Sequence, residues 1–169
     1  VTSKGRLCYN EVDQMQGLGF VFKDSAMIFE AGLMLGNGAG AVSDNVRGEI
    51  TGETDNDFKS VIAVKRKVPD TVSEFDLTGM FAEDPSLLNK LDALVSHRAY
   101  AWSAPPDHRY VIVQYIIVNN GTGNLNNLYA GIFADWDITG STYADDRAAL
   151  DPANRMGYVF NTVTGMHGG

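Results

Sequence analysis

The chain has 169 residues, of which 44% are hydrophobic and 10% aromatic, so it can bury a core and is too apolar to be disordered. A net charge of −8 repels nucleic-acid phosphates and anionic lipid head groups, which excludes nucleic acid as an expected partner. Cys8 is the single cysteine, so no internal disulfide forms, and we expect a small buried side chain rather than a nucleophile. No apolar run approaches the roughly 20 residues of a membrane span.

Short apolar segments separated by turn residues predict strands in the first half of the chain. Residues 18–22 and 26–36 flank Lys23-Asp24-Ser25, and this pattern favours a hairpin. Residues 57–67 and 73–80 are two further predicted strands. The first of them ends in three basic residues, a charge pattern typical of a protected sheet edge.

One segment of the chain predicts an α-helix. Asp84 precedes Pro85 as a cap before a first-turn proline. Apolar residues follow at helical spacing: Leu87, Leu88, Leu91, Leu94 and Val95. We therefore expect a helix packed on a sheet, with His97 close to its end in a capping or surface role.

The second half of the chain carries the strongest β signals. Residues 109–119 and 125–138 are dense in β-branched and aromatic residues, and residues 120–124 between them have turn chemistry, so we predict a long central hairpin. Residues 157–163 predict one more strand. Together these elements predict a mainly β fold, an antiparallel β-sandwich of jelly-roll or related topology with one packed α-helix. We expect one domain over residues 1–169, cut from a longer protein.

No catalytic motif is found in the sequence. The glycine-rich stretch 36–40 lacks the helix and glycine spacing of a phosphate-binding loop. His97, His108 and His167 lie far apart and show no zinc-ligand spacing. A Gly-x-Ser-x-Gly nucleophile motif is also missing. We therefore expect no enzyme activity from this domain. A hydrolase ranks third among the hypotheses, after an accessory domain and a carbohydrate-binding module.

Tyr100 and Trp102 are the candidate ligand-binding residues. They alternate along one predicted strand beside a stiff Pro105-Pro106 turn. Such an arrangement suits a core strand, which is the interpretation that we favour, and it also suits a sugar-stacking platform.

An acidic segment near the C-terminus offers the candidate metal ligands. Asp135 and Asp137 project from one face at the end of a strand, and Asp146 occupies the twelfth place of a loose calcium-loop pattern. Pairing with Arg147 or Arg155, or hydrogen bonds from backbone amides, would satisfy the same carboxylates without metal. We favour this second solution, with no cofactor, and keep calcium at Asp135, Asp137 and Asp146 as the alternative.

Several segments together resemble a known type of domain. They are Gly19-Phe20, Glu30–Gly36, Val42–Arg47, Asn127–Ile138 with its Asp135-Trp136-Asp137 pattern, and Arg155–Phe160. These residues resemble a β-domain of exported multidomain proteins of Bacteroidetes and Chlorobi type, where it often lies downstream of a subtilisin-like serine peptidase domain. The resemblance implies a secreted or cell-surface accessory module, and it transfers no catalytic residue.

The sequence therefore predicts a non-catalytic accessory or binding domain whose partners are neighbouring domains of the same polypeptide. A carbohydrate-binding module, with a glycan or cell-surface component as its partner, is the alternative. We expect Asp135, Trp136, Asp137 and Arg155 to have structural roles at the end of their strands.

Overall fold

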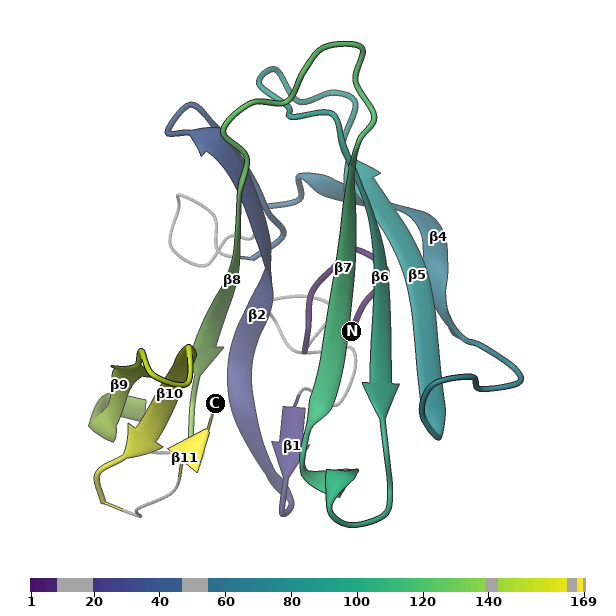
Figure 1. Cartoon of the computed structure of the whole chain (residues 1–169). Coiled ribbons are helices and arrows are strands. Elements are labelled where there is room, and N and C mark those ends of the chain that lie inside the picture. The colour runs from purple at the N-terminus through teal and green to yellow at the C-terminus, as the bar shows by residue number, and fades with distance from the viewer. Residues whose placement is uncertain (9–19, 47–54, 139–142, 164–166, 169) are drawn as a thin grey trace.

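The structure is a computed structural model of the chain, and it describes residues 1–8, 20–46, 55–138, 143–163 and 167–168 (Figure 1). Over these residues the fold is mainly β, with two short 3-10 helices, η1 (Asp107–Arg109) and η2 (Tyr143–Asp145). None of the helices in these ranges could cross a membrane. The strands are β1 (Phe20–Phe22), β2 (Ser25–Gly38), β3 (Ala41–Ser43), β4 (Phe58–Arg66), β5 (Phe75–Glu83), β6 (Ala93–Ala101), β7 (Val111–Asn119), β8 (Tyr129–Trp136), β9 (Asp146–Asp151), β10 (Met156–Asn161) and β11 (His167–Gly168).

The strands form three antiparallel sheets. The β2 sheet has the order β1-β2-β3, and β8 also pairs with β2. The β6 sheet has the order β4-β5-β6-β7, and the small β10 sheet has the order β11-β10-β9. Figure 1 shows the β10 sheet near the end of β8 and the β2 sheet beside the β6 sheet. The antiparallel, mainly β character predicted from the sequence is confirmed.

The main core joins the β2 sheet to the β6 sheet. Leu33 and Leu35 of β2 pack in one buried cluster with Phe58 of β4, Phe81 of β5 and Val95 of β6. The rings of Phe58 and Phe81 lie 4.9 Å apart between centroids. Burial of each such side chain stabilises the fold by about 1.5–3 kcal/mol, so this cluster holds the two sheets against each other.

The first predicted hairpin is confirmed for the described residues 20–38. Phe22 of β1 pairs with Ser25 of β2 across a two-residue turn. Lys23 and Asp24 form this turn with φ values of 48° and 63°. Positive φ at both central residues matches the right-handed twist of the flanking strands, which is why a short polar turn closes the hairpin.

The predicted α-helix over residues 84–95 is wrong. The segment makes turns at residues 85–86 and 88–89, and β6 begins at Ala93. The Glu83 carboxylate accepts hydrogen bonds from the backbone N–H of Leu91 at 2.9 Å and of Ala93 at 2.8 Å. These amides are therefore held by a side chain instead of by helical carbonyls. His97 consequently lies in the middle of β6, buried, and not at a helix end.

The predicted central hairpin is also wrong in its pairing, although both of its strands exist. β7 pairs with β6, so that Tyr115 lies opposite His97. β8 pairs with β2, so that Ile132 lies opposite Leu33. Residues 120–128 thus carry the chain from the β6 sheet to the β2 sheet rather than closing a turn between partners.

The other strand predictions match the structure. Residues 57–67, 73–80 and 157–163 correspond to β4, β5 and β10, while β3, β9 and β11 were not predicted. β4 lies at the edge of the β6 sheet, as its basic residues indicated.

Candidate functional site

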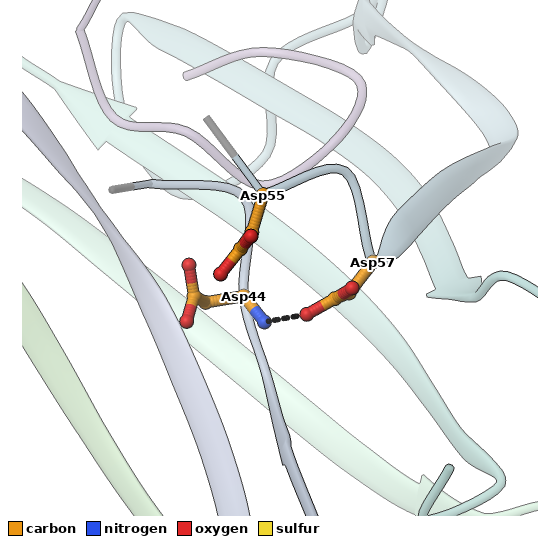
Figure 2. Close-up of side chains that lie close together, drawn as sticks. All are labelled: Asp44, Asp55 and Asp57. Atoms are coloured by element: carbon orange, nitrogen blue, oxygen red, sulfur yellow. Dashed lines mark hydrogen bonds between the residues drawn. The ribbon is translucent and has the colours of Figure 1, made fainter. Parts of the chain in front are cut away.

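Three aspartates gather where the chain leaves the β2 sheet and enters β4 (Figure 2). Asp44 follows β3, and Asp55 and Asp57 precede β4. Each offers a carboxylate oxygen, and the three oxygens lie within 4.8 Å of one another. Asp44 is 3% exposed, and the other two are half-buried. Figure 2 shows the hydrogen bond that the backbone N–H of Asp44 donates to Asp57, with a length of 3.1 Å.

Asn45 fixes the backbone beneath this acidic cluster. Its side-chain amide donates to the carbonyl oxygens of Lys4 and Phe58 at 3.2 and 3.0 Å. Its side-chain oxygen accepts from the backbone N–H of Phe58 at 2.7 Å. A buried amide with these partners ties the N-terminal segment, the residues after β3 and the start of β4 to one another.

Burial sets the electrostatics of the cluster. It raises the pKa of Asp44 to about 6, against the lowering effect of the hydrogen bond from the Val46 N–H. The neighbouring carboxylates of Asp55, Asp57 and Glu30 raise this pKa further. Burial also raises the pKa of Asp57, which the hydrogen bond from the Asp44 N–H opposes. The surroundings therefore disfavour the ionised forms of Asp44 and Asp57.

The chemistry available to this cluster is limited to binding a proton or a hard cation. Carboxylate oxygens are the ligands that calcium and magnesium prefer, but calcium takes about six to eight oxygens. Asp44, Asp55 and Asp57 supply only part of such a set. Sequence reasoning missed this cluster, although Asp44-Asn45 and Asp55-Asn56-Asp57 repeat the same residue types at the two ends of one connection.

A cavity of about 430 Å³ lies between the β2 sheet and the β6 sheet. It is found at the end of the sheets where β1 lies and β7 begins, at the bottom of Figure 1. Apolar residues of both sheets form its walls, and the aromatic members of the lining are Phe20, Phe75, Tyr100, Tyr110 and Trp136. Phe20 and Trp136 meet edge to face, with ring centroids 6.0 Å apart.

The two candidate ligand-binding residues lie at this end of the β6 sheet. Tyr100 is half-buried on β6 and belongs to the cavity lining, while its hydroxyl donates to Gln114 Oε1 at 3.3 Å. Trp102 follows β6, half-buried, and its ring lies 5.7 Å from that of Tyr110. The structure brings both residues close to one cavity, and sugar binding by them stays a prediction.

The predicted calcium residues lie at the junction of β8 and the β10 sheet. Asp135 lies on β8 and Asp137 directly follows that strand, both half-buried. The Asp146 carboxylate accepts hydrogen bonds from the Ile138 N–H and from Asn161 Nδ2, each at 2.9 Å. Residues 139–142 of the proposed loop lie outside the described residues, so calcium binding stays a prediction.

The two predicted structural residues outside this acidic set have different surroundings. Trp136 packs on the small cluster of Cys8, Ile28 and Ala31. Arg155 is exposed in the turn before β10, where its backbone N–H donates to the Pro152 carbonyl at 3.3 Å. Its predicted ion pair with the aspartates stays a prediction.

Two chemically reactive side chains are enclosed in the core. Cys8 is buried, and its Sγ donates to the Phe29 carbonyl at 3.6 Å. His97 is buried against the ring of Phe81, 5.1 Å away between centroids. Burial lowers the pKa of His97 to about 4, so the imidazole is neutral at physiological pH.

Comparisons with known proteins add no relative to this description. The chain matches no family model, no curated protein and no solved structure.

Proposed function

We propose that this chain is a non-catalytic accessory module of an exported bacterial protein, built as a β-sandwich, which docks against a neighbouring part of the same polypeptide. The observation that carries the proposal is an apolar stripe on the outer face of the β6 sheet, which ends in three exposed apolar side chains of the edge strand β7. Three properties of this surface support docking: its side chains, its backbone and its charge.

The side chains of β7 alternate between the core and the surface. Tyr115 and Ile117 pack on the main core. Ile112, Ile116 and Val118 lie on the opposite face, and they are 46%, 40% and 48% exposed. Three large apolar side chains on one exposed strand form the kind of patch that marks an interaction surface.

One apolar row of side chains crosses the whole β6 sheet. The strand register places Ile116 opposite Ser96, Ser96 opposite Met80, and Met80 opposite Ile62. Met80 is half-buried, and Ile62 is 44% exposed at the far edge. This row spans all four strands without a charged side chain, while the rows on either side of it hold Arg98, Lys65 and Lys59. The apolar contact that the face offers is therefore a stripe that is widest at β7.

The two edges of the β6 sheet differ in charge. β4 carries Lys59, Lys65 and Arg66, and such basic residues discourage pairing with another strand. β7 carries no charged residue over Val111–Asn119. Within the described part of the chain, β7 has a strand partner on one side only. Its second side therefore offers backbone N–H and C=O groups to a docked partner.

A tethered neighbour suits this surface better than a second copy does. Two copies would each bring a net charge of −8, which opposes their association. A segment joined covalently to the module acts at a millimolar effective concentration, so a contact of modest intrinsic affinity is sufficient. We therefore assign the face to a neighbouring domain.

The surroundings of the reactive side chains support a non-catalytic role. Cys8 and His97 are both buried in apolar clusters, out of reach of a substrate in solution. A neutral imidazole with a lowered pKa inside the core fits a packing role rather than general-base catalysis.

The experiment compares this chain alone with the longer protein encoded by its gene. Hydrogen exchange is measured at the β7 amides in both, with Ile116→Lys and the matched edge variant Val61→Lys, since Val61 is 55% exposed on β4. We expect β7 to be protected only in the longer protein. Ile116→Lys should remove that protection and leave the isolated chain folded, whereas Val61→Lys should change neither.

Equal exchange of β7 in the two proteins would contradict docking through this surface. A concentration-dependent dimer of the isolated chain, abolished by Ile116→Lys, would instead identify a second copy as the partner. Hydrolysis of casein, esters or polysaccharides by the isolated chain would contradict the non-catalytic role.

A further inference from the structure

The cavity between the β2 sheet and the β6 sheet is a second candidate site, separate from the docking face. Its volume of about 430 Å³ falls in the lower part of the range of ligand pockets, roughly 300–1,000 Å³. The wall between the aromatic residues is aliphatic, and it is formed by Val1, Leu7, Ile28, Leu77, Ala99, Ala101, Val111 and Val113. The wall therefore favours an apolar ligand.

The cavity has one basic side chain in its described lining, that of Arg109. Arg109 ends η1 just before β7, and it is exposed. Among the described residues, no hydrogen bond or ion pair engages its guanidinium group. A guanidinium beside an apolar cavity can form two parallel hydrogen bonds with a carboxylate or a similar anion.

The two tyrosine hydroxyls of the aromatic lining are already engaged. The Tyr110 hydroxyl donates to Asp107 Oδ1, and the Tyr100 hydroxyl donates to Gln114 Oε1. A sugar would need several free donors and acceptors to replace its bonds to water. An apolar molecule with one anionic end needs only the apolar wall and Arg109.

We infer that this cavity binds a free amphiphile, a small molecule with an apolar body and one carboxylate or sulfonate group. The apolar body lies between the two sheets against Trp136 and Val113. The anionic group lies at the cavity opening and accepts hydrogen bonds from Arg109. The site belongs to this chain alone and does not depend on a neighbouring domain.

The binding test uses decanoate below its micellar concentration, with decanol and decyltrimethylammonium as neutral and cationic controls. The chain has two tryptophans, and Trp136 lies in the wall, so tryptophan emission reports binding. We expect saturable binding of decanoate, and binding of the two controls that is at least about tenfold weaker, because charge-assisted hydrogen bonds exceed neutral ones. 1-Anilinonaphthalene-8-sulfonate should compete with decanoate.

Two variants separate the anionic contact from the apolar one. Arg109→Gln should weaken decanoate about tenfold and leave decanol unchanged. The matched control Arg98→Gln removes the same charge from an exposed residue of β6 that does not line this cavity, and it should have no effect. Ala99→Phe adds a ring to the buried wall and should reduce binding of both molecules. Thermal melts verify that each variant is folded.

Four results with soluble ligands would overturn the inference. They are no saturable binding of decanoate, equal affinity for decanoate and decanol, insensitivity to Arg109→Gln in a folded variant, and selective binding of an oligosaccharide that competes with the sulfonate probe. Sedimentation with anionic phosphatidylglycerol vesicles without binding of free decanoate would replace a free amphiphile with a lipid surface, and would overturn it as well.

Discussion

Glu83 should be one of the side chains on which the stability of this chain most depends. Its carboxylate is buried and accepts three hydrogen bonds, from Ser43 Oγ at 2.5 Å, Leu91 N at 2.9 Å and Ala93 N at 2.8 Å. These bonds join β3 and the segment before β6 to the end of β5. Glu83→Ala removes all three hydrogen bonds at once.

The cost follows from the two backbone amides that the variant would leave without acceptors. Leu91 and Ala93 are 5% and 2% exposed, so water cannot easily replace the carboxylate. Each buried unsatisfied group costs about 1–3 kcal/mol, and we expect a loss of about 3–5 kcal/mol in the free energy of unfolding. Because small domains have about 5–15 kcal/mol in total, Glu83→Ala should be marginally folded.

Urea unfolding followed by tryptophan emission measures this loss. Glu83→Gln is the matched control, because its amide keeps one acceptor oxygen and nearly the same volume. We expect it to lose about half as much as Glu83→Ala, on the order of 1–2 kcal/mol. A free energy of unfolding for Glu83→Ala within about 0.5 kcal/mol of the parent chain would refute the reasoning.

Three other predictions concern buried positions. Gly79→Ala should cost about 1–3 kcal/mol in a urea titration, because a Cβ there would lie 2.4 Å from His97 Nε2; a loss that His97→Ala does not reduce would contradict this cause. Asn45→Ala should cost about 2–4 kcal/mol by the same measurement, since it removes both bonds to Phe58; an unchanged midpoint would disprove it. Because folding raises the pKa of Asp44, protonation of this carboxyl group stabilises the folded chain. This contribution is complete below about pH 4 and is lost as the pH rises through about 6, and it amounts to at most about 3 kcal/mol. Asp44→Asn should therefore gain relative to the parent chain between pH 4 and 7, and equal pH profiles would exclude the effect.

The wrong helix prediction shows that strand pairing between distant segments can override a local helical pattern. Asp84 and the spaced leucines have the pattern of a capped helix, yet Asp84 Oδ1 accepts from the Ser86 N–H in a tight turn, and Leu88 is 97% exposed. The end of the same segment instead forms the start of β6, which pairs with β5. Periodicity along one segment carries no information about the strand that lies opposite it.

Strand composition likewise could not identify strand partners. The dense apolar runs of β7 and β8 were recognised as strands, but sequence neighbours need not be sheet neighbours. The turn of Lys23 and Asp24 was easier, because two polar residues between short apolar runs leave little choice of pairing. The prediction therefore succeeded for short connections and failed for residues 120–128.

The candidate sites could not be predicted in full, because they depend on which distant segments lie together in the folded chain. Asp44 and Asp57 are separated by a connection whose ends meet only in the folded chain, and the cavity is formed from strands of two sheets. The sequence indicated Tyr100 and Trp102 by their residue types alone. It gave no means of placing Arg109 beside them, because that position depends on how η1 leads into β7.

The unequal edges of the β6 sheet also limit how this chain can aggregate. A fibril grows only if every molecule has two sheet edges that can pair with another strand, because each added copy must present a new free edge. Here the basic side chains of β4 block one edge, and only β7 can accept a strand. Two copies that meet through β7 bury this edge in a self-complementary, closed contact, and further addition then stops. Misassembly through this sheet should therefore end at a discrete pair rather than at a polymer.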